Sequence, residues 1–337
     1  MNELNRRGFL VAGAATLAAP LQAQQRPAAL DLAELAKKAA AEGEVTYYAS
    51  TNPVLSQRLA DLFNKSYPGI KVNIVRLASG PLARRYAAEA QAGSVVADIL
   101  QMGDLLAIEE GIAKGWFARI DDLPAHQAWP SGYKDAHSAL VSLFPHTITY
   151  NTNLVKGPDV PTGWQSVLNE KWRGKILMAD PRNSPTLMEW CVMMHDTYGA
   201  DYLKRLASLK PRVVASTLPG TQMVAAGEAA FVLPNLRMVS YSLIEKKAPL
   251  DDVTPSPNSG LESILAVSAN GKHPNAARLL SNFILSRPGQ EVLSKDTAAS
   301  PMGELPGALA LPQNFHRAKI KEAMARAPQI LQLLALE

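Results

Sequence analysis

An arginine stands where a predicted helix begins. In VLPNLRMVSYS, residues 232–242, a strand-like run meets a Pro-Asn pair, so Arg237 falls in the first helical turn and Tyr241 follows on the same face. The positive end of a helix dipole disfavours a cation, whereas a guanidinium pairs well with carboxylate, phosphonate or phosphate. We therefore interpret Arg237 and Tyr241 as contacts for an anion. The alternatives are a salt bridge from Arg237 to an acid such as Glu228 or Glu262, and ordinary packing of the tyrosine within its helix.

Three further side chains are candidates for contact with a small anion. Arg182, in DPRNS, is a second candidate cation, although Asp180 could hold it locally. Tyr150 lies with Asn151 at the end of the strand-like run FPHTITYN, at an expected lobe crossing, and could equally belong to a hinge. Asp104 follows a short predicted strand, where we expect it to cap the next helix while facing the same edge of the sheet.

Polar residues next to proline mark the expected starts of several helices. STNP (50–53), SGP (79–81) and NSPT (183–186) each join a strand-like run to a helical pattern, and PGT (219–221) forms a similar corner. Proline fits the first helical position, and a polar cap satisfies one amide while others stay free for an anion. Caps that serve only the fold are the alternative. The candidate contacts at these corners are Thr51, Asn52, Ser79, Gly80, Ser184 and Thr221.

Strand-like and helix-like segments alternate along most of the chain, which predicts parallel, doubly wound sheets. A stretch rich in Pro, Gly and Trp after residue 157 separates two such rhythms. We therefore expect an α/β protein of two lobes, each a sheet flanked by helices, with a ligand cleft between them. Lobe 1 is expected to comprise residues 26–145 and 255–310, and lobe 2 residues 146–254. Helices are expected in residues 311–337, in a lobe that the pattern leaves open.

The first 25 residues have the layout of an export signal. A polar segment with two arginines precedes an apolar stretch, and small residues lead to an expected cleavage after Ala23. NRRGFL resembles the twin-arginine export motif; an ordinary secretory signal is the alternative. We expect a periplasmic protein.

Composition argues against several function classes. A net charge of +4 over 337 residues is too small and scattered for a nucleic-acid-binding protein. A single cysteine, Cys191, excludes an intramolecular disulfide. Nucleotide-binding and nucleophile-elbow motifs are absent, and the six histidines lack the spacing of a zinc site. The paired acids Asp251 and Asp252 are expected to form a solvated turn. We predict no cofactor and no bound metal.

Five blocks occur in a fixed order along the chain: YPGIKVNIVRLASGPLARRYAAEAQAG-SVVADIL, ITYNTNLV, KWRGKILMADPRNS, AAGEAAFVL and KHPNAARLLSNFILSRPGQEVL. Together they resemble the extracellular solute-binding proteins of ABC importers, and the nearest branch contains the ferric-iron-binding proteins. The resemblance covers about Glu42 to Leu293. It implies the two-lobe periplasmic-binding-protein fold, closure of the lobes over a ligand, delivery to a membrane permease, and no chemistry on the ligand.

The resemblance to the ferric binders weakens at one point. That branch supplies an adjacent pair of tyrosines after the GE-containing strand, because phenolate oxygens suit ferric iron. This chain has Leu236-Arg237 at about that place. Its one Tyr-Tyr pair, Tyr47-Tyr48, lies in a predicted strand, where neighbouring side chains point to opposite faces.

From these observations we predict the exported substrate-binding component of an ABC transporter. It is expected to capture a small anionic solute, an organic carboxylate or a phosphonate or phosphate ester, by hinge closure and to act as a monomer. The alternatives are a ferric-iron-binding transport protein and, from another class, an exported hydrolase or cofactor enzyme.

Overall fold

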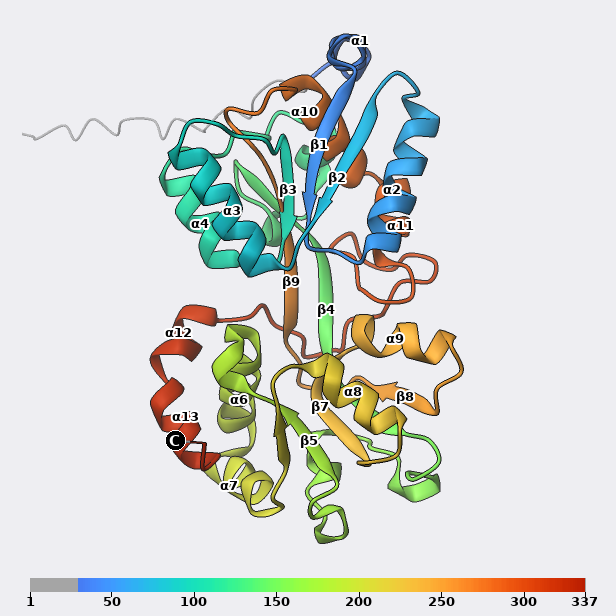
Figure 1. The fold of residues 1–337 in the computed structure, drawn as a ribbon, viewed down its shortest axis with the longest axis vertical. Coiled ribbons are helices and arrows are strands. Elements are labelled where there is room, and N and C mark those ends of the chain that lie inside the picture. The colour runs from blue at the N-terminus through green and yellow to red at the C-terminus, as the bar shows by residue number, and fades with distance from the viewer. Residues whose placement is uncertain (1–29, 337) are drawn as a thin grey trace, which may run out of the picture.

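The computed structural model describes residues 30–336, which form two lobes, one above the other in Figure 1. One long strand, β4 (Ser138–Asn151), runs through both lobes and is buried along its whole length. Its first half pairs antiparallel with β9 (Gly260–Val267), and its second half with β7 (Phe231–Leu236) and β8 (Leu250–Val253). A single strand is thus shared by two sheets, and the predicted two-lobe α/β fold is confirmed. The predicted export signal lies outside the described residues.

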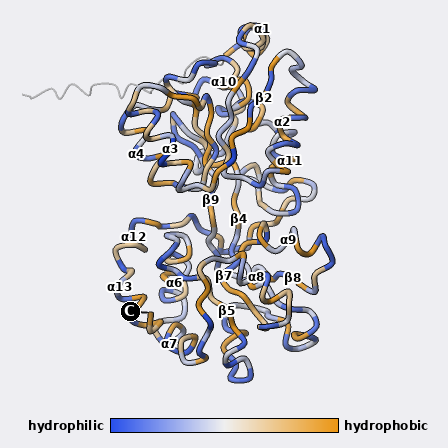
Figure 2. The backbone as a smooth tube through the Cα atoms, viewed as in Figure 1, coloured by the Kyte–Doolittle hydropathy of each residue, from blue (hydrophilic) through white to orange (hydrophobic). Residues whose placement is uncertain are grey.

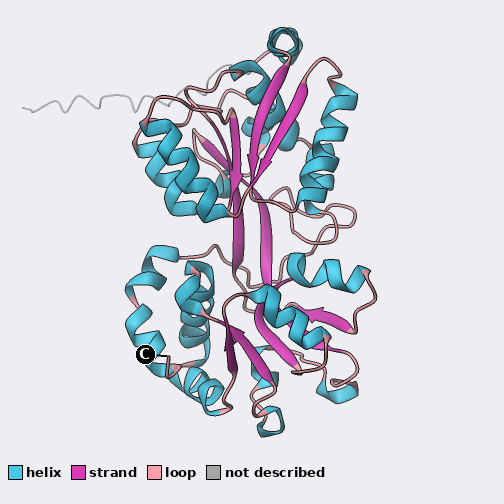
Figure 3. Ribbon diagram, in the orientation of Figure 1, coloured by secondary structure: helices cyan, strands magenta, loops and turns pink. Residues whose placement is uncertain are grey.

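Lobe 1 is a mixed sheet with the strand order β2-β1-β3-β9-β4. Strands β1, β2 and β3 are parallel, as the strand–helix alternation predicts, and β9 returns antiparallel to β3. Helices cover both faces of this sheet (Figure 3). The remaining elements of the lobe are α1 (Leu32–Glu42), β1 (Glu44–Ala49), α2 (Pro53–Ser66), β2 (Lys71–Arg76), α3 (Ser79–Gln91), β3 (Ile99–Met102), α4 (Leu105–Ala113), α5 (Pro124–Ala128), α10 (Pro274–Ile284) and α11 (Arg287–Ser294).

Lobe 2 continues the sheet from β4 in the order β7-β5-β6, with β8 also pairing with β4. Strands β5, β6 and β7 are parallel to one another. The remaining strands and helices of the lobe are β5 (Ile176–Ala179), α6 (Pro185–Tyr198), α7 (Ala200–Ser208), β6 (Arg212–Val214), α8 (Thr217–Ala225) and α9 (Arg237–Glu245). Short 3-10 turns are η1 (Ser131–Tyr133) in lobe 1 and η2 (Gly157–Asp159), η3 (Trp164–Val167), η4 (Glu170–Trp172) and η5 (Pro181–Asn183) in lobe 2.

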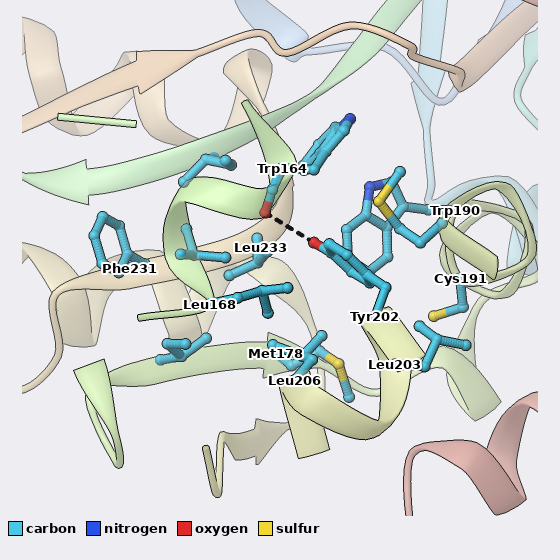
Figure 4. Close-up of a cluster of buried hydrophobic side chains, with 14 of the residues drawn as sticks. Trp164, Leu168, Met178, Trp190, Cys191, Tyr202, Leu203, Leu206, Phe231 and Leu233 are labelled. Atoms are coloured by element: carbon cyan, nitrogen blue, oxygen red, sulfur yellow. Dashed lines mark hydrogen bonds between the residues drawn. The ribbon is translucent and has the colours of Figure 1, made fainter. Parts of the chain in front are cut away.

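Each lobe has its own hydrophobic core, and hydrophobic segments follow the strands in both lobes (Figure 2). In lobe 2 the rings of Trp164 and Trp190 meet edge to face with centroids 5.2 Å apart. The Tyr202 hydroxyl donates a hydrogen bond of 3.0 Å to the Trp164 carbonyl (Figure 4). Cys191 is buried beside these rings, so it is a core residue rather than a reactive thiol.

The C-terminal helices belong to lobe 2. The chain crosses between the lobes a third time, from lobe 1 to lobe 2, and α12 (Ile320–Ala325) and α13 (Ala327–Leu333) then pack on α6 and α7. Ala323 and Ile330 are fully buried in the lobe 2 core. On the way, Arg317 pairs with Glu262 of β9 at 2.7 Å. The crossing segment is therefore attached to lobe 1 and then continues into lobe 2.

Most predicted elements match the structure, and two local predictions are wrong. Residues 250–253 form strand β8 instead of a solvated turn, and the Asp252 side chain is only 2% exposed. This edge strand has one buried, one exposed and two half-buried positions, and its pair of acidic residues does not indicate a strand in the sequence. Helix α8 begins at Thr217, four residues before the predicted corner at Thr221.

Candidate functional site

A cavity of about 290 Å³ lies between the two lobes; we call it the cleft cavity. Lobe 1 contributes the starts of α3 and α4, and lobe 2 contributes η5 and the start of α6, while β9 and α12 complete the walls. The lining residues are Ser79, Gly80, Gly103, Asp104, Leu105, Leu106, Asn183, Ser184, Pro185, Thr186, Leu261 and Ile320.

A larger groove, of about 830 Å³, lies on lobe 1 between α2 and α11. Its rim carries both charges, for example Arg58 and Lys65 beside Asp61 and Glu291. Only lobe 1 lines this groove, so closure of the lobes would not enclose a ligand there. The cleft cavity is the better candidate because both lobes build it.

Three helix N-termini border the cleft cavity. Helix α3 begins at Ser79, α4 follows its cap Asp104, and α6 follows Ser184. The first amides of a helix have no carbonyl partner within that helix, and the helix dipole adds positive potential there. The Ser184 side chain makes no capping hydrogen bond, so no side-chain cap occupies the first amides of α6. This arrangement suits a bound anion.

Four predicted contacts come together here: Ser79, Gly80, Asp104 and Ser184. The predicted capping role of Asp104 is confirmed, since its carboxylate accepts a hydrogen bond from the Ala107 amide at 3.1 Å. The predicted capping role of Ser79 is wrong, because α3 already begins at Ser79. Its hydroxyl instead accepts a hydrogen bond of 3.0 Å from the Gly103 amide and so ties α3 to the end of β3.

Thr51 and Asn52 do not line the cleft cavity. Asn52 is the predicted helix cap, and its side chain accepts a hydrogen bond from the Val54 amide at 2.9 Å. Thr51 is buried, and its hydroxyl has no hydrogen-bond partner in the described part of the chain. A role for either residue in binding stays a prediction.

Arg237 begins α9, as predicted, but it is held by an acid that the sequence did not single out. Its guanidinium donates a 3.0 Å hydrogen bond to Asp252. The two acids considered earlier are engaged elsewhere: Glu228 faces Arg212 at 3.5 Å and Glu262 binds Arg317.

Asp252 also accepts a hydrogen bond of 2.5 Å from Ser240. Burial raises the pKa of Asp252, and the hydroxyls of Ser240 and Thr149 together with Arg237 partly offset that shift. Arg237 therefore stabilises the ionised form of Asp252, which burial alone would disfavour.

The other predicted cation is also engaged within its own lobe. Arg182 makes two-pronged contact with Asp180, whose pKa is lowered chiefly by the hydrogen bonds from Arg182. It also donates to the Leu336 carbonyl at 3.0 Å. Arg182 does not line the cleft cavity, so the alternative interpretation, a local pair, describes its contacts.

Three further candidates lie away from the cleft cavity. The guanidinium of Arg237 sits 5.7 Å from the ring centre of Tyr241. Tyr150 is a buried core residue of β4 whose hydroxyl reaches Asp251 at 3.4 Å. Thr221 lies inside α8, where its hydroxyl donates to the Thr217 carbonyl at 2.8 Å. The predicted helix start at Thr221 is therefore wrong, and any solute contact by these residues stays a prediction.

A buried network of polar side chains links strands β4, β7 and β8 with helices α8 and α9, and the sequence did not predict it. The Asn235 amide donates to Thr149 at 2.7 Å and to Thr221 at 2.9 Å. Thr149 in turn donates to Asp252, which holds Arg237. The start of α9 is thereby connected through hydrogen bonds to β4, β7 and α8.

His146 lies where β4 passes from one lobe to the other, and it is fully buried. The backbones of Asn235 and Thr186 lie beside the ring, but neither ring nitrogen has a partner with hydrogen-bonding geometry among residues 30–336. Burial lowers the pKa of His146 to about 4. The imidazole is therefore neutral at neutral pH.

Several lining residues of the cleft cavity were not predicted, and most are apolar. Leu105, Leu106 and Leu261 had the signature of ordinary core residues, and Ile320 comes from the C-terminal helices. Asn183 and Thr186 lie within the predicted corner NSPT (183–186), of which only Ser184 is a predicted contact. Considering the residues on both sides of each cap, rather than the cap alone, would have found these two residues.

Residues 44–296, about three quarters of the chain, match the model of the bacterial extracellular solute-binding protein family. The chain belongs to this family. As a bacterial extracellular solute-binding protein, it is a member of a transport class whose proteins bind small ligands and work with membrane permeases of ABC importers. The expected family is thus confirmed.

Solved structures of this class share the fold. A substrate-binding protein of an ABC transporter from Agrobacterium tumefaciens is 14% identical, with a TM-score of 0.73 over 86% of this chain and 94% of its own. Iron-bound HitA from Pseudomonas aeruginosa is 18% identical, with a TM-score of 0.66 over 85% and 99%. The periplasmic binding protein AfuA from Actinobacillus pleuropneumoniae, with fructose-6-phosphate bound, is 20% identical, with a TM-score of 0.66 over 88% and 99%.

Two findings concern residues 30–336 of this solute-binding protein. No helix in that range is long and apolar enough to cross a membrane. No three or more His, Cys, Asp or Glu side chains gather there in a group that could hold a metal ion.

The adjacent tyrosines Tyr47 and Tyr48 pack into two separate hydrophobic clusters of lobe 1, as predicted for neighbours in a strand. Burial raises the pKa of both hydroxyls. The Tyr47 hydroxyl donates to Gln101 and the Tyr48 hydroxyl to Glu89. This pair therefore does not supply two phenolates to one site.

Proposed function

We propose that this protein captures a small anionic solute in the cleft cavity, by closing its lobes over it, and delivers it to a membrane permease of an ABC importer. The solute class is an organic carboxylate or a phosphonate or phosphate ester. We propose further that the exported protein acts in the periplasm as a monomer, after a signal ending at Ala23 is removed.

One observation carries the anionic class: helix N-termini from both lobes border a single cavity. An anion between them would accept hydrogen bonds from both sides and would favour the closed state over the open one. The closed, ligand-bound protein thereby differs in shape from the open, free protein, and a permease can distinguish the two. Arg237 and Arg182, the predicted cationic contacts, are paired with Asp252 and Asp180, so the backbone amides are the preferred partners of the anion.

A thermal-shift screen tests this function. The probes are carboxylates, phosphonates, sugar phosphates and ferric salts, and a bound ligand raises the unfolding midpoint. Ferric salts serve the iron-transport alternative, which the fold shared with iron-bound HitA keeps in view. Turnover of a probe would support the enzyme alternative instead of a receptor.

A matched pair of variants then tests the site. Ser184→Asp and Ser184→Asn both place a good helix cap before α6, and they differ chiefly in charge. We expect Ser184→Asp to weaken binding of an anionic hit by roughly tenfold or more relative to Ser184→Asn, because like charges would lie within a few ångströms. Isothermal calorimetry measures the difference. Equal affinities in the two variants, or tighter binding to Ser184→Asp as a cation would show, would contradict an anion at this site.

A further inference from the structure

We propose that the cleft cavity selects a monocarboxylate with an aliphatic chain over dianionic and polyhydroxylated solutes. This rests on the proposed function, since it assumes that the cleft cavity is the solute site. Two properties of the walls carry it: a modest positive potential at one side and a cluster of aliphatic side chains at the other.

The positive potential suits at most about one negative charge. Each helix N-terminus is equivalent to roughly half a positive charge, so three together supply about one and a half. The Asp104 carboxylate opposes this, and the lining contains no Lys, Arg or His. Among the described residues, an exposed cation, Arg84, comes within 3.4 Å of the position that a Cβ on Gly80 would occupy, but it is not part of the lining. A dianion would therefore bring a second negative charge that no group in the lining compensates.

The buried His146 is not a cation behind α6 at neutral pH. Its ring lies beside the Thr186 backbone, in the first turn of α6, and among the described residues neither ring nitrogen has a hydrogen-bond partner. Because burial keeps this imidazole neutral, it adds polarity near the helix start without adding charge.

The second property of the cleft cavity is a wall of aliphatic side chains. Leu105 and Leu106 come from the first turn of α4, Leu261 from β9 and Ile320 from α12. Leu106 is 37% exposed, so part of its side chain is open to the cavity that it lines.

The polar side chains of the lining are few, and some are already engaged. Ser79 accepts from the Gly103 amide, and the Asn183 amide donates to the Ala215 carbonyl at 3.1 Å. A polyhydroxylated sugar would bury hydroxyls against these leucines without partners, which costs free energy. An alkyl chain would instead gain from the same contacts.

Calorimetry with a matched ligand series tests the proposal on the full mature protein. The probes are butanoate, hexanoate, octanoate, hexyl phosphate, hexanol and fructose 6-phosphate. We expect each added methylene of the carboxylates to tighten binding by about fourfold until the cavity is full. Hexyl phosphate, with a charge near −2, is expected to bind more weakly than hexanoate.

Three substitutions localise the effect. Leu106→Ser should weaken hexanoate binding by roughly fivefold, whereas Leu154→Ser, at a leucine that is 47% exposed and outside the cleft cavity, should leave it unchanged. Asp104→Asn keeps a helix cap and removes the opposing charge. It should therefore improve hexyl phosphate binding more than hexanoate binding.

The outcomes separate this proposal from the proposed function. Carboxylate affinities that ignore chain length, or tighter binding of hexyl phosphate or fructose 6-phosphate than of hexanoate, would overturn the aliphatic monocarboxylate and leave an anion receptor standing. Absence of binding by every anion, here and in the wider screen, would overturn the proposed function itself.

Discussion

At the scale of single residues, the chain compensates its charges within each lobe. Arg237 pairs with Asp252, and Arg182 pairs with Asp180. The Asp252 side chain is 2% exposed and the Arg237 side chain 25% exposed, so the former pair is largely shielded from water. Removing one member of such a pair leaves the other buried without its counter-charge.

We expect Arg237→Ala to lower the free energy of unfolding by about 1–2 kcal/mol, because Asp252 keeps only its hydroxyl partners. The thermal shift produced by an anionic hit should persist, since this arginine does not line the cleft cavity. Urea titration measures the first quantity and the ligand screen the second. Arg212→Ala, at an exposed pair with Glu228, is the control and should change stability by less than about 0.5 kcal/mol. Loss of the thermal shift in Arg237→Ala would restore the arginine as a solute contact.

His146 makes a pH prediction at the same scale. Its pKa is lowered by burial from 6.5 to about 4, so the unfolded chain binds this proton more readily than the folded one. Stability should therefore decrease as pH falls from about 6.5 to 4, by on the order of 3 kcal/mol in total.

The variant His146→Gln should lose most of this pH dependence. Urea unfolding of both proteins across that pH range gives the comparison. Glu189, whose pKa burial raises, favours stability at lower pH, but it is common to both proteins and cancels in the difference. Parallel pH curves for the two proteins would show that the ring titrates normally in the folded state.

At the scale of elements, the C-terminal helices are structural parts of lobe 2. Ile330 of α13 is fully buried in the core that Figure 4 shows in part, whereas Met324 of α12 is 43% exposed. Helix α12 also places Ile320 in the wall of the cleft cavity. The last helices thus support the core and complete the site.

Ile330→Ala should lower the free energy of unfolding by about 2–4 kcal/mol, because it leaves a cavity in a packed core. Met324→Ala removes a side chain of similar size from the surface and should cost less than about 1 kcal/mol. Chemical denaturation followed by tryptophan fluorescence measures the change, since three of the five tryptophans, Trp164, Trp172 and Trp190, lie in the lobe 2 core. Equal effects of the two substitutions would mean that α13 is not part of the core.

At the scale of the whole molecule, the features that depend on neighbouring residues in the sequence were the easiest to predict. Asn52 and Asp104 cap helices that begin beside them in sequence, so their positions followed from spacing alone. The partner of Arg237 could not be predicted, because Asp252 lies in strand β8. The acidic pair Asp251-Asp252 is more typical of a solvated turn than of a strand. Ile320 enters the cavity from a segment whose lobe only the tertiary packing decides.

The shared strand and the late helices also constrain how the chain folds during synthesis. Lobe 1 lacks α10, α11 and β9 until residue 294 has been made, and lobe 2 lacks Ile330 until nearly the end of the chain. Neither core can be completed from an N-terminal fragment. Lobe 1 therefore reaches its final packing only after residue 294 has left the ribosome, and lobe 2 only after residue 330, so each lobe exposes an incomplete core until those residues emerge.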